Sequence, residues 1–316
     1  MLKTLEKSSC YDEYWRFAHL RQERFYARLN GTTSEPNEIL DTFKFTNCYR
    51  ILDRTSQYLI KNIMPSETYD PASTFFRAVL FKVFNKIETW QHLESKLGSI
   101  SIESYDEKLY SDILKNLKNC EKIYSAAYIM PSGKNEYGSH IKHENNLRMI
   151  TYMLKIGLHE KVWEAKTLKG IYDLFLGIPS IGRFLAFQYS IDICYSEHSL
   201  AEENQFVAAG PGALRGISKC FPNAAASQAE SIIKYMTDNQ DSEFERLGIP
   251  FKYLTNRKLQ LIDCQNLFCE IDKYLRVARP DLNQKKSRIK QHYKKNDKEI
   301  SFVLPKKWKA SIPRSI

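Results

Sequence analysis

The fold of this chain is decided by the stretch LKGIYDLFLGIPSIGRFLAFQYSIDIC, residues 168–194. Apolar residues recur every three or four positions on both sides of a short connection at residues 177–182, and this spacing predicts two helices. Gly182 ends the connection and is a residue type that can open a helix. The stretch is therefore predicted to form two helices joined by a tight turn.

The same helical spacing extends over most of the 316 residues. In residues 75–90, FFRAVLFKVFNKIETW, apolar side chains recur at helical intervals with charged residues between them. Similar patterns occur at residues 14–29, 49–63, 147–156 and 261–275, whereas only short pieces such as residues 302–304 are typical of strands. We expect a mostly α-helical protein in one or two lobes, with a helical domain at residues 1–280 and a loosely ordered basic segment at residues 281–316.

Positive charge is concentrated at the C-terminal end of the chain. From Lys273 onward there are 14 Lys and Arg against three acidic residues, a net charge of +11, whereas all preceding residues together sum to −1. A neutral body with such a segment favours contact with a polyanion, above all a nucleic-acid backbone. The alternative is a charged tail that is only solvated.

Several protein classes find no support in the sequence. No run of about 18 apolar residues occurs, and the first residues lack the apolar centre of a secretory signal, so we expect a cytoplasmic protein without membrane contact. The seven cysteines form no CxxC pair, and His140 and His143 have no further ligands nearby. The patterns GxxxxGK[ST] and GxGxxG are missing as well. We therefore expect no metal and no cofactor.

The predicted pair of helices at about residues 168–194 resembles a helix-hairpin-helix motif. In such hairpins the N–H groups at the start of the second helix bind a DNA phosphate without reading the sequence. The predicted DNA-binding residues are accordingly Pro179, Ser180, Ile181, Gly182 and Arg183. Ser180 stands where the motif usually has its first glycine, and an ordinary helical hairpin packed into the core is the alternative.

An acidic loop follows about twenty residues after the hairpin, in the sequence EENQFVAAGPGA. Helix-hairpin-helix DNA glycosylases place a catalytic carboxylate at this offset, and the chain resembles them in arrangement. A carboxylate stabilises the positive charge that builds on the sugar when the glycosidic bond breaks. The candidate acids are Glu203, with Glu202 and Asp192 as alternatives, unless the loop is merely solvated. Two glycines are expected to form a tight turn that DNA can approach closely, Gly210 and Gly212.

A more specific resemblance covers most of the chain. Its motifs are YWRF at residues 14–17, FTNCYR at 45–50, DR at 53–54, SQY at 56–58, FKVFNK at 81–86, ETW at 88–90, GPGA at 210–213, DCQNLFCE at 263–270 and KY at 273–274. In these motifs the chain resembles the helical domain of the 5-hydroxymethyluracil DNA kinases, a family related to the α-glutamyl/putrescinyl thymine pyrophosphorylases. The resemblance implies a divergent helix-hairpin-helix glycosylase-like domain that acts on a base in DNA. The kinase module of some members is missing here, so we expect the helical domain to act alone.

Polar residues within these motifs could line a pocket for a flipped base, which needs hydrogen-bonding groups and an aromatic ring. The predicted pocket residues are Asn47, Tyr49, Arg50, Asp53, Gln57, Asn85 and Lys86. A buried network of Arg50 with Asp53 or Glu88 is the alternative. Lys273 is a further candidate for DNA contact, although its spacing from Glu270 also suits a salt bridge within a helix.

The leading hypothesis is a monofunctional DNA glycosylase that flips a modified pyrimidine out of phage-type DNA and excises it, as a defence against phages. Its partner would be double-stranded DNA with modified pyrimidines, and we expect a monomer. The monofunctional class follows from Phe184, which occupies the place where glycosylases with lyase activity carry a lysine. Two alternatives stay open. One is a transferase that acts on an activated 5-hydroxymethylpyrimidine in DNA, and the other is a non-catalytic module that binds modified bases.

Overall fold

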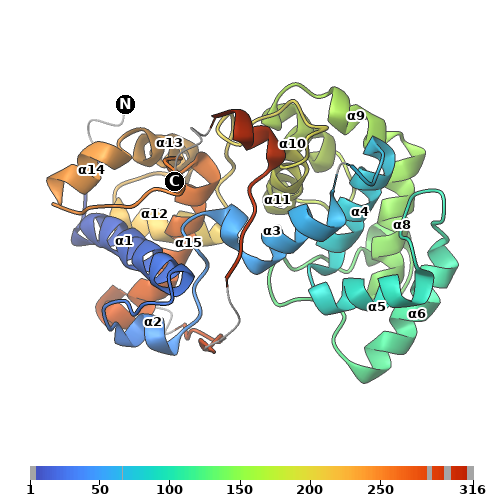
Figure 1. Ribbon diagram of the computed structural model, residues 1–316, viewed down its shortest axis with the longest axis horizontal. Helices are drawn as coiled ribbons and strands as arrows, with labels where there is room; N and C mark the ends of the chain where they lie inside the picture. Colours follow the sequence, from blue (N-terminus) through green and yellow to red (C-terminus); the bar gives the residue numbers. More distant parts are fainter. Residues whose placement is uncertain (1–4, 66, 283–286, 295–299, 312–316) are drawn as a thin grey trace. The chain divides into compact units, whose positions relative to one another are not determined.

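The computed structural model describes residues 5–65, 67–282, 287–294 and 300–311, with side chains up to Trp308 in the last range. The described part is mostly α-helical, as predicted, with fifteen α-helices and only isolated β-bridges (Figure 1). Residues 302–304, which resembled a strand, belong to no strand. The amide of the Gln57 side chain pairs instead with the backbone N–H and C=O of Val303, at 2.9 and 3.0 Å.

The chain divides into two compact units. Unit 1 comprises residues 1–53, 207–302 and 312–316, and unit 2 comprises residues 54–206 and 303–311. Each unit is thus assembled from segments that are far apart in the sequence. In the described residues, no helix is both long enough and apolar enough to span a membrane.

Unit 1 is built around α15, the last α-helix of the chain's described residues. Its α-helices are α1 (Ser9–Leu29), α2 (Glu38–Thr42), α12 (Pro211–Cys220), α13 (Ala229–Asp238), α14 (Gln240–Arg246) and α15 (Leu261–Ala278). Aromatic rings join α1 to α15, where the centroids of Tyr14 and Phe268 lie 4.7 Å apart. Figure 1 shows α1 in blue beside the orange helices of the chain's last third, which confirms the helices predicted at residues 14–29 and 261–275.

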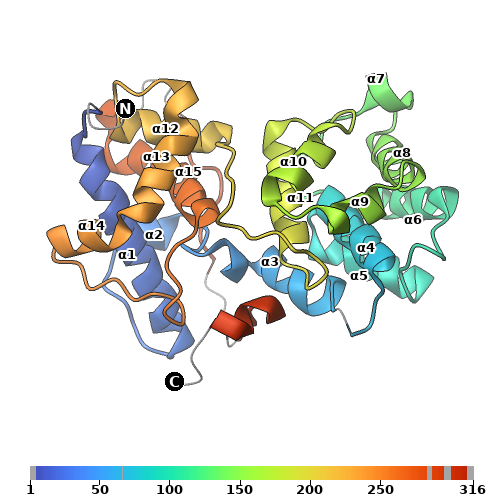
Figure 2. The same cartoon turned by 90° about the horizontal axis from the view of Figure 1, so that it is seen from above.

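The other helices of unit 2 are arranged around α4 (Figure 2). The residues of this helix from Ser73 to Phe84 are all buried. Its α-helices are α3 (Arg54–Tyr58), α4 (Pro71–Phe84), α5 (Ile87–Leu97), α6 (Glu107–Cys120), α7 (Lys134–Tyr137), α8 (Lys142–Lys155), α9 (Leu158–Glu164), α10 (Leu168–Leu176) and α11 (Arg183–Cys194). Asp70 caps the first turn of α4 by accepting hydrogen bonds from the N–H groups of Ala72 and Ser73. The two predicted helices at residues 168–194 are confirmed as α10 and α11, with a connection at residues 177–182.

Two helices predicted as continuous are interrupted. The stretch at residues 49–63 breaks at Asp53, whose backbone is extended, and the stretch at residues 75–90 breaks at Asn85, whose backbone is left-handed with φ +48°. Apolar spacing continues through both breaks, so periodicity alone could not reveal them. The polar residues at positions 47–57 therefore do not lie on one continuous helix.

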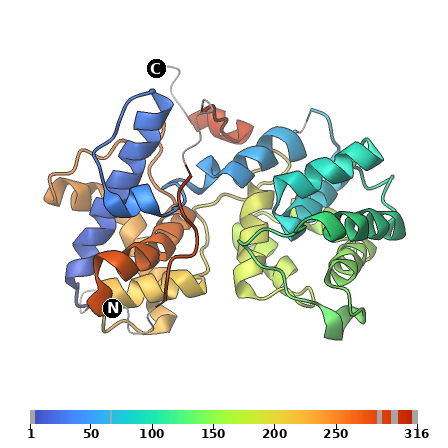
Figure 3. The same cartoon turned by 90° about the horizontal axis from the view of Figure 1, so that it is seen from below.

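The described parts of the basic C-terminal segment are packed against the rest of the chain. In unit 1 the N–H of Tyr293 donates to the C=O of Thr42 (2.9 Å), and the N–H of Lys44 donates to the C=O of Gln291 (3.0 Å). In unit 2 Trp308 is buried against Tyr195. Figure 3 shows the described residues of this segment in red tones. The expectation of a loosely ordered segment therefore does not hold for these residues.

Candidate functional site

Four of the predicted pocket residues lie together in unit 1. The N–H of Asn47 donates to Oδ1 of Asp53 (3.1 Å), and Nδ2 of Asn47 donates to the C=O of Leu52 (3.0 Å). The N–H of Arg50 donates to Oδ1 of Asp263 (2.8 Å), and the Tyr49 hydroxyl accepts from the N–H of Leu254 (3.1 Å). Hydrogen bonds to α15 and to the loop before it thus hold this turn in shape. We call Arg21, Asn47, Asp53, Glu270 and Lys273 the unit 1 cluster.

Arg21 and Glu270 complete this cluster from two other helices. Arg21 of α1 donates from Nε to the C=O of Thr46 (3.0 Å) and from Nη2 to Oδ1 of Asn47 (3.1 Å). Glu270 of α15 accepts from the N–H of Thr46 (2.9 Å) and from Nζ of Lys273 (2.7 Å). The Glu270–Lys273 salt bridge within a helix is therefore confirmed. Sequence reasoning missed Arg21, for which an arginine four residues beyond the YWRF motif was a faint signal.

Electrostatics single out Asp53 within the unit 1 cluster. The pKa of its carboxyl is raised to about 6, mainly by burial and also by the nearby Glu270 carboxylate, although the hydrogen bond from the Asn47 N–H lowers it. The guanidinium groups of Arg50 and Arg21 act in the opposite direction. A carboxyl group with this pKa can exchange a proton near neutral pH.

A second group of charged and aromatic residues lies inside unit 2. Nζ of Lys82 on α4 lies 2.8 Å from Oδ2 of Asp192 on α11, and their side chains are only 3% and 6% exposed. The same ammonium lies 3.8 Å from the centroid of the Tyr128 ring, which stacks on Phe184 at 6.0 Å. Asp192, an alternative catalytic acid, is thus the partner of a buried lysine. An ion pair removed from water in this way is costly to break.

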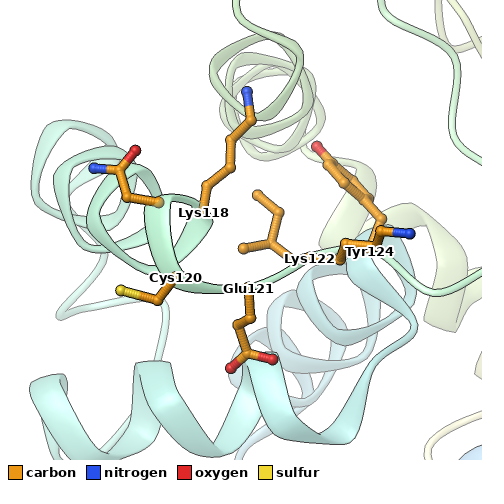
Figure 4. Close-up of a pocket in the computed structure, with 7 residues that line it drawn as sticks. Lys118, Cys120, Glu121, Lys122 and Tyr124 are labelled. Atoms are coloured by element: carbon orange, nitrogen blue, oxygen red, sulfur yellow. The ribbon is translucent and has the colours of Figure 1, made fainter.

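Two further predicted pocket residues hold the segment that leads to Tyr128. Nδ2 of Asn85 donates to Oγ of Ser125 (3.2 Å), and Nζ of Lys86 donates to the C=O of Lys122 and to Glu121, both at 2.5 Å. This segment lines a cavity of about 460 Å³, formed by residues 118–124. In Figure 4 the Glu121 carboxylate points away from the side on which Lys118 and Tyr124 extend.

The predicted pocket residues do not form one set. Asn47, Tyr49, Arg50 and Asp53 belong to unit 1, whereas Gln57, Asn85 and Lys86 belong to unit 2. In the network proposed as the alternative, Glu88 is paired with Arg54 at 3.4 Å. Whether these residues receive a base stays a prediction.

The connection between α10 and α11 has the backbone geometry of a glycine-containing turn. Ser180 adopts a left-handed backbone with φ +71°, the conformation that glycine takes most easily. Gly182 is the N-cap of α11 and supplies no side-chain cap, so the first N–H groups of this helix lack an internal acceptor of that kind. Arg183 is exposed beside them. The departure at Ser180 therefore leaves the turn itself intact.

The two candidate acids of the following loop differ in exposure. Glu203 is buried, whereas Glu202 is exposed. Nearby, Nζ of Lys307 donates to the C=O of Ala201 (2.6 Å), so the C-terminal segment is fixed to this loop.

The glycines at residues 210–213 serve helix packing. Gly210 is the N-cap of α12, and a Cβ on Gly212 would lie 3.0 Å from Sγ of Cys269 on α15. This close packing explains Gly212 without any approach of DNA, and the predicted DNA contact of both glycines and of Lys273 stays a prediction. In the described residues no three His, Cys, Asp or Glu side chains are placed to share a metal ion.

Comparisons with known proteins match nearly the whole chain to one family. The family described as "5-hmdU DNA kinase, helical domain" matches residues 8–284. A curated relative, the 5-hmdU DNA kinase of Bacillus phage SP10, is 22% identical over 312 residues, which cover 90% of this chain and 48% of the relative. The chain thus spans about half the length of this relative. No solved structure gives a significant match.

These findings overturn the predicted activity. A glycosylase hydrolyses the bond between base and sugar, whereas the matched family and relative carry the name of a kinase, which transfers a phosphoryl group and leaves that bond intact. The prediction of a monofunctional DNA glycosylase, a hydrolase of antiviral defence, is therefore wrong. Its two alternatives, the transferase for activated bases and the non-catalytic module, are not supported either. The hairpin offset and Phe184 suggested a glycosylase because they describe a backbone arrangement, which does not specify a reaction.

Proposed function

Because the chain belongs to the family of the 5-hmdU DNA kinase helical domain, we propose that it acts in the phosphorylation of 5-hydroxymethyluracil bases in DNA. The observation that carries this proposal is the family match over residues 8–284, a range that contains the unit 1 cluster and the buried Lys82–Asp192 pair. The target base carries a primary alcohol, whose oxygen is the acceptor of the phosphoryl group. Thymine, with a methyl group at the same position, has no such acceptor.

Phosphoryl transfer to this alcohol requires a general base that accepts the proton of its hydroxyl group. Kinases commonly use an aspartate for that purpose, and the carboxylate must be ionised to act. Asp53 is our candidate, since its raised pKa lies near neutral pH and Arg21 and Asn47 hold the turn around it. The relative is about twice as long as this chain. We therefore propose Asp53 for the DNA side of the reaction and assign the phosphoryl donor to no residue here.

The hairpin of α10 and α11 is our candidate for contact with the DNA backbone, as a helix-hairpin-helix element. Three features support it: the left-handed Ser180, the N-terminus of α11 without a side-chain cap, and the exposed Arg183. Such a site binds phosphate by N–H groups and the helix dipole, without sequence preference. Double-stranded DNA is accordingly the partner that we propose.

The test compares two duplexes that differ only in one 5-hydroxymethyluracil or thymine. The chain is incubated with each duplex and ATP labelled at the γ-phosphate, and both transfer of label and equilibrium binding are measured. We expect at least several-fold tighter binding to the hydroxymethylated duplex, and any label that is transferred to occur only in that duplex. Equal binding to both duplexes without transfer would contradict the proposal.

A further inference from the structure

The ring of Tyr128 lies beside Phe184 and Lys82 in unit 2, and we call the space that this ring occupies the slot. One face of the ring is stacked on Phe184, with the planes at 19° to each other, and the ammonium of Lys82 lies 3.8 Å from its centroid. A ring that stacks on an aromatic ring and also lies near a cation is held by stacking and by cation–π attraction. A nucleobase has the same flat shape and the same kind of π-face.

The backbone that carries Tyr128 is strained. Its φ is +54°, in the left-handed region that a bulky residue enters only at an energetic cost. Ser125 before it is anchored by the C=O of Phe84 (3.0 Å) and by Asn85, whereas Ile129 after it is 71% exposed. The tyrosine thus sits in a strained surface turn that is fixed on its N-terminal side.

A cavity opens next to this turn. Its volume is about 460 Å³, and it is lined by residues 129–131 and by Ser180 and residues 182–185 at the start of α11. Phe184 therefore belongs both to the slot and to the cavity wall. Arg183 and the N–H groups of the first turn of α11 provide positive charge at the same wall, where a phosphate of a nucleotide could be bound.

We propose that this slot is a nucleobase-binding site and that Tyr128 is its gate. When Tyr128 swings out, relief of its backbone strain offsets part of the lost stacking, and a base takes its place between Phe184 and Lys82. The buried carboxylate of Asp192 and the Lys82 ammonium then face the base with an acceptor and a donor. The slot is proposed for a nucleobase of the bound DNA and belongs to another unit than Asp53, so it stands independently of the role proposed for Asp53.

The first test uses free nucleosides. Tyr128→Asn removes the ring, and asparagine tolerates the left-handed backbone. In isothermal titrations with 5-hydroxymethyl-2′-deoxyuridine and with thymidine, this variant is expected to bind at least about fivefold more tightly than the wild type. Adding Phe184→Ala should abolish the gain. The matched control is Thr255→Asn, which changes a left-handed residue of unit 1 and should leave binding unchanged.

The second test uses DNA and separates the two proposals. 2-Aminopurine beside a 5-hydroxymethyluracil in a duplex reports the unstacking of the base. Tyr128→Asn and Tyr128→Gly should raise this signal, and Phe184→Ala should lower it. The melting temperature of Tyr128→Gly should equal or exceed that of the wild type. If neither Tyr128 variant binds nucleosides more tightly than the wild type, the slot proposal is wrong. If the variants bind nucleosides but the wild type does not distinguish the two duplexes, the proposed function fails and the slot remains.

Discussion

At the scale of single residues, the chain keeps several charged groups where water is scarce. Lys82 and Asp192 neutralise each other inside unit 2, at 2.8 Å. Asp53 differs, because repulsion by Glu270 adds to the effect of burial on its pKa, which Arg50 and Arg21 only partly oppose. Its ionised form is therefore disfavoured in the folded state, a cost typical of functional carboxyl groups.

Replacing Asp53 by Asn should stabilise the protein above pH 6. The folded state holds the Asp53 proton more tightly than the unfolded state, because the pKa rises from 3.8 to about 6. The contribution of this group to stability is thus greatest below about pH 4 and is lost as the pH rises to about 6. Asn keeps an oxygen for the N–H of Asn47. Urea unfolding at pH 7.5 should show a gain of about 1–2 kcal/mol, since water screens a half-buried carboxyl, and little gain at pH 4.

Asp112→Asn, at an exposed carboxyl of α6, is the control and should show no such difference between the two pH values. If Asp53 accepts the proton of the hydroxymethyl group, phosphoryl transfer should also rise with pH up to about 6 in the wild type. A gain in stability that is equal at both pH values would show that Asp53 is not raised in pKa.

At the scale of elements, unit 1 depends on the close approach of α12 and α15. A Cβ on Gly216 would lie 2.0 Å from the carbonyl oxygen of Phe268, so the backbones of the two helices are in direct contact there. The hairpin of α10 and α11 uses its glycine differently, because a Cβ on Gly182 would meet nothing within 4 Å. Close helix packing thus requires a glycine at position 216, whereas no steric contact requires one at position 182.

The two glycines should respond differently to alanine. Gly216→Ala forces α12 away from α15 and should cost at least about 3 kcal/mol, in the range of severe overpacking. Gly182→Ala should change stability by less than about 1 kcal/mol, since its φ of −85° suits alanine. Thermal unfolding of both variants measures the difference. Equal melting temperatures would mean that α12 and α15 do not meet as described.

At the scale of the whole molecule, the chain enters unit 2 twice, at residues 54 and 303, and its basic C-terminal segment takes part in both units. The described residues of this segment are fixed by backbone pairing with residues 42–44 and by Lys307 and Trp308. Several of its lysines remain exposed, among them Lys290 and Lys294. An anchored segment presents positive charge to DNA at a lower entropic cost than a free tail.

Neutralising Lys290 and Lys294 to Gln should weaken binding to all duplexes alike. Each phosphate contact that is lost removes about 0.9 from the slope of log K against log salt, so the double variant should lose up to about 1.8. Preference for 5-hydroxymethyluracil over thymine should not change, because backbone contacts carry no base information. Lys96→Gln on α5 is the single-charge comparison at an exposed lysine. A salt slope equal to that of the wild type would show that these lysines do not contact DNA.

Sequence by itself determined the helical class, the hairpin at residues 168–194 and the resemblance to the family that the comparisons confirm. These features are local, because apolar spacing and short motifs are encoded within a few neighbouring residues. Tertiary structure alone decided that Arg21 and Glu270 join Asn47 and Asp53, that the predicted pocket residues are divided between two units, and that Gly212 packs on Cys269. Such contacts depend on packing between segments that are tens to hundreds of residues apart, which no local pattern records. The predicted reaction failed for a related reason: an acid at a given offset from a hairpin describes a backbone path, and the chemistry depends on the groups that the fold brings to it.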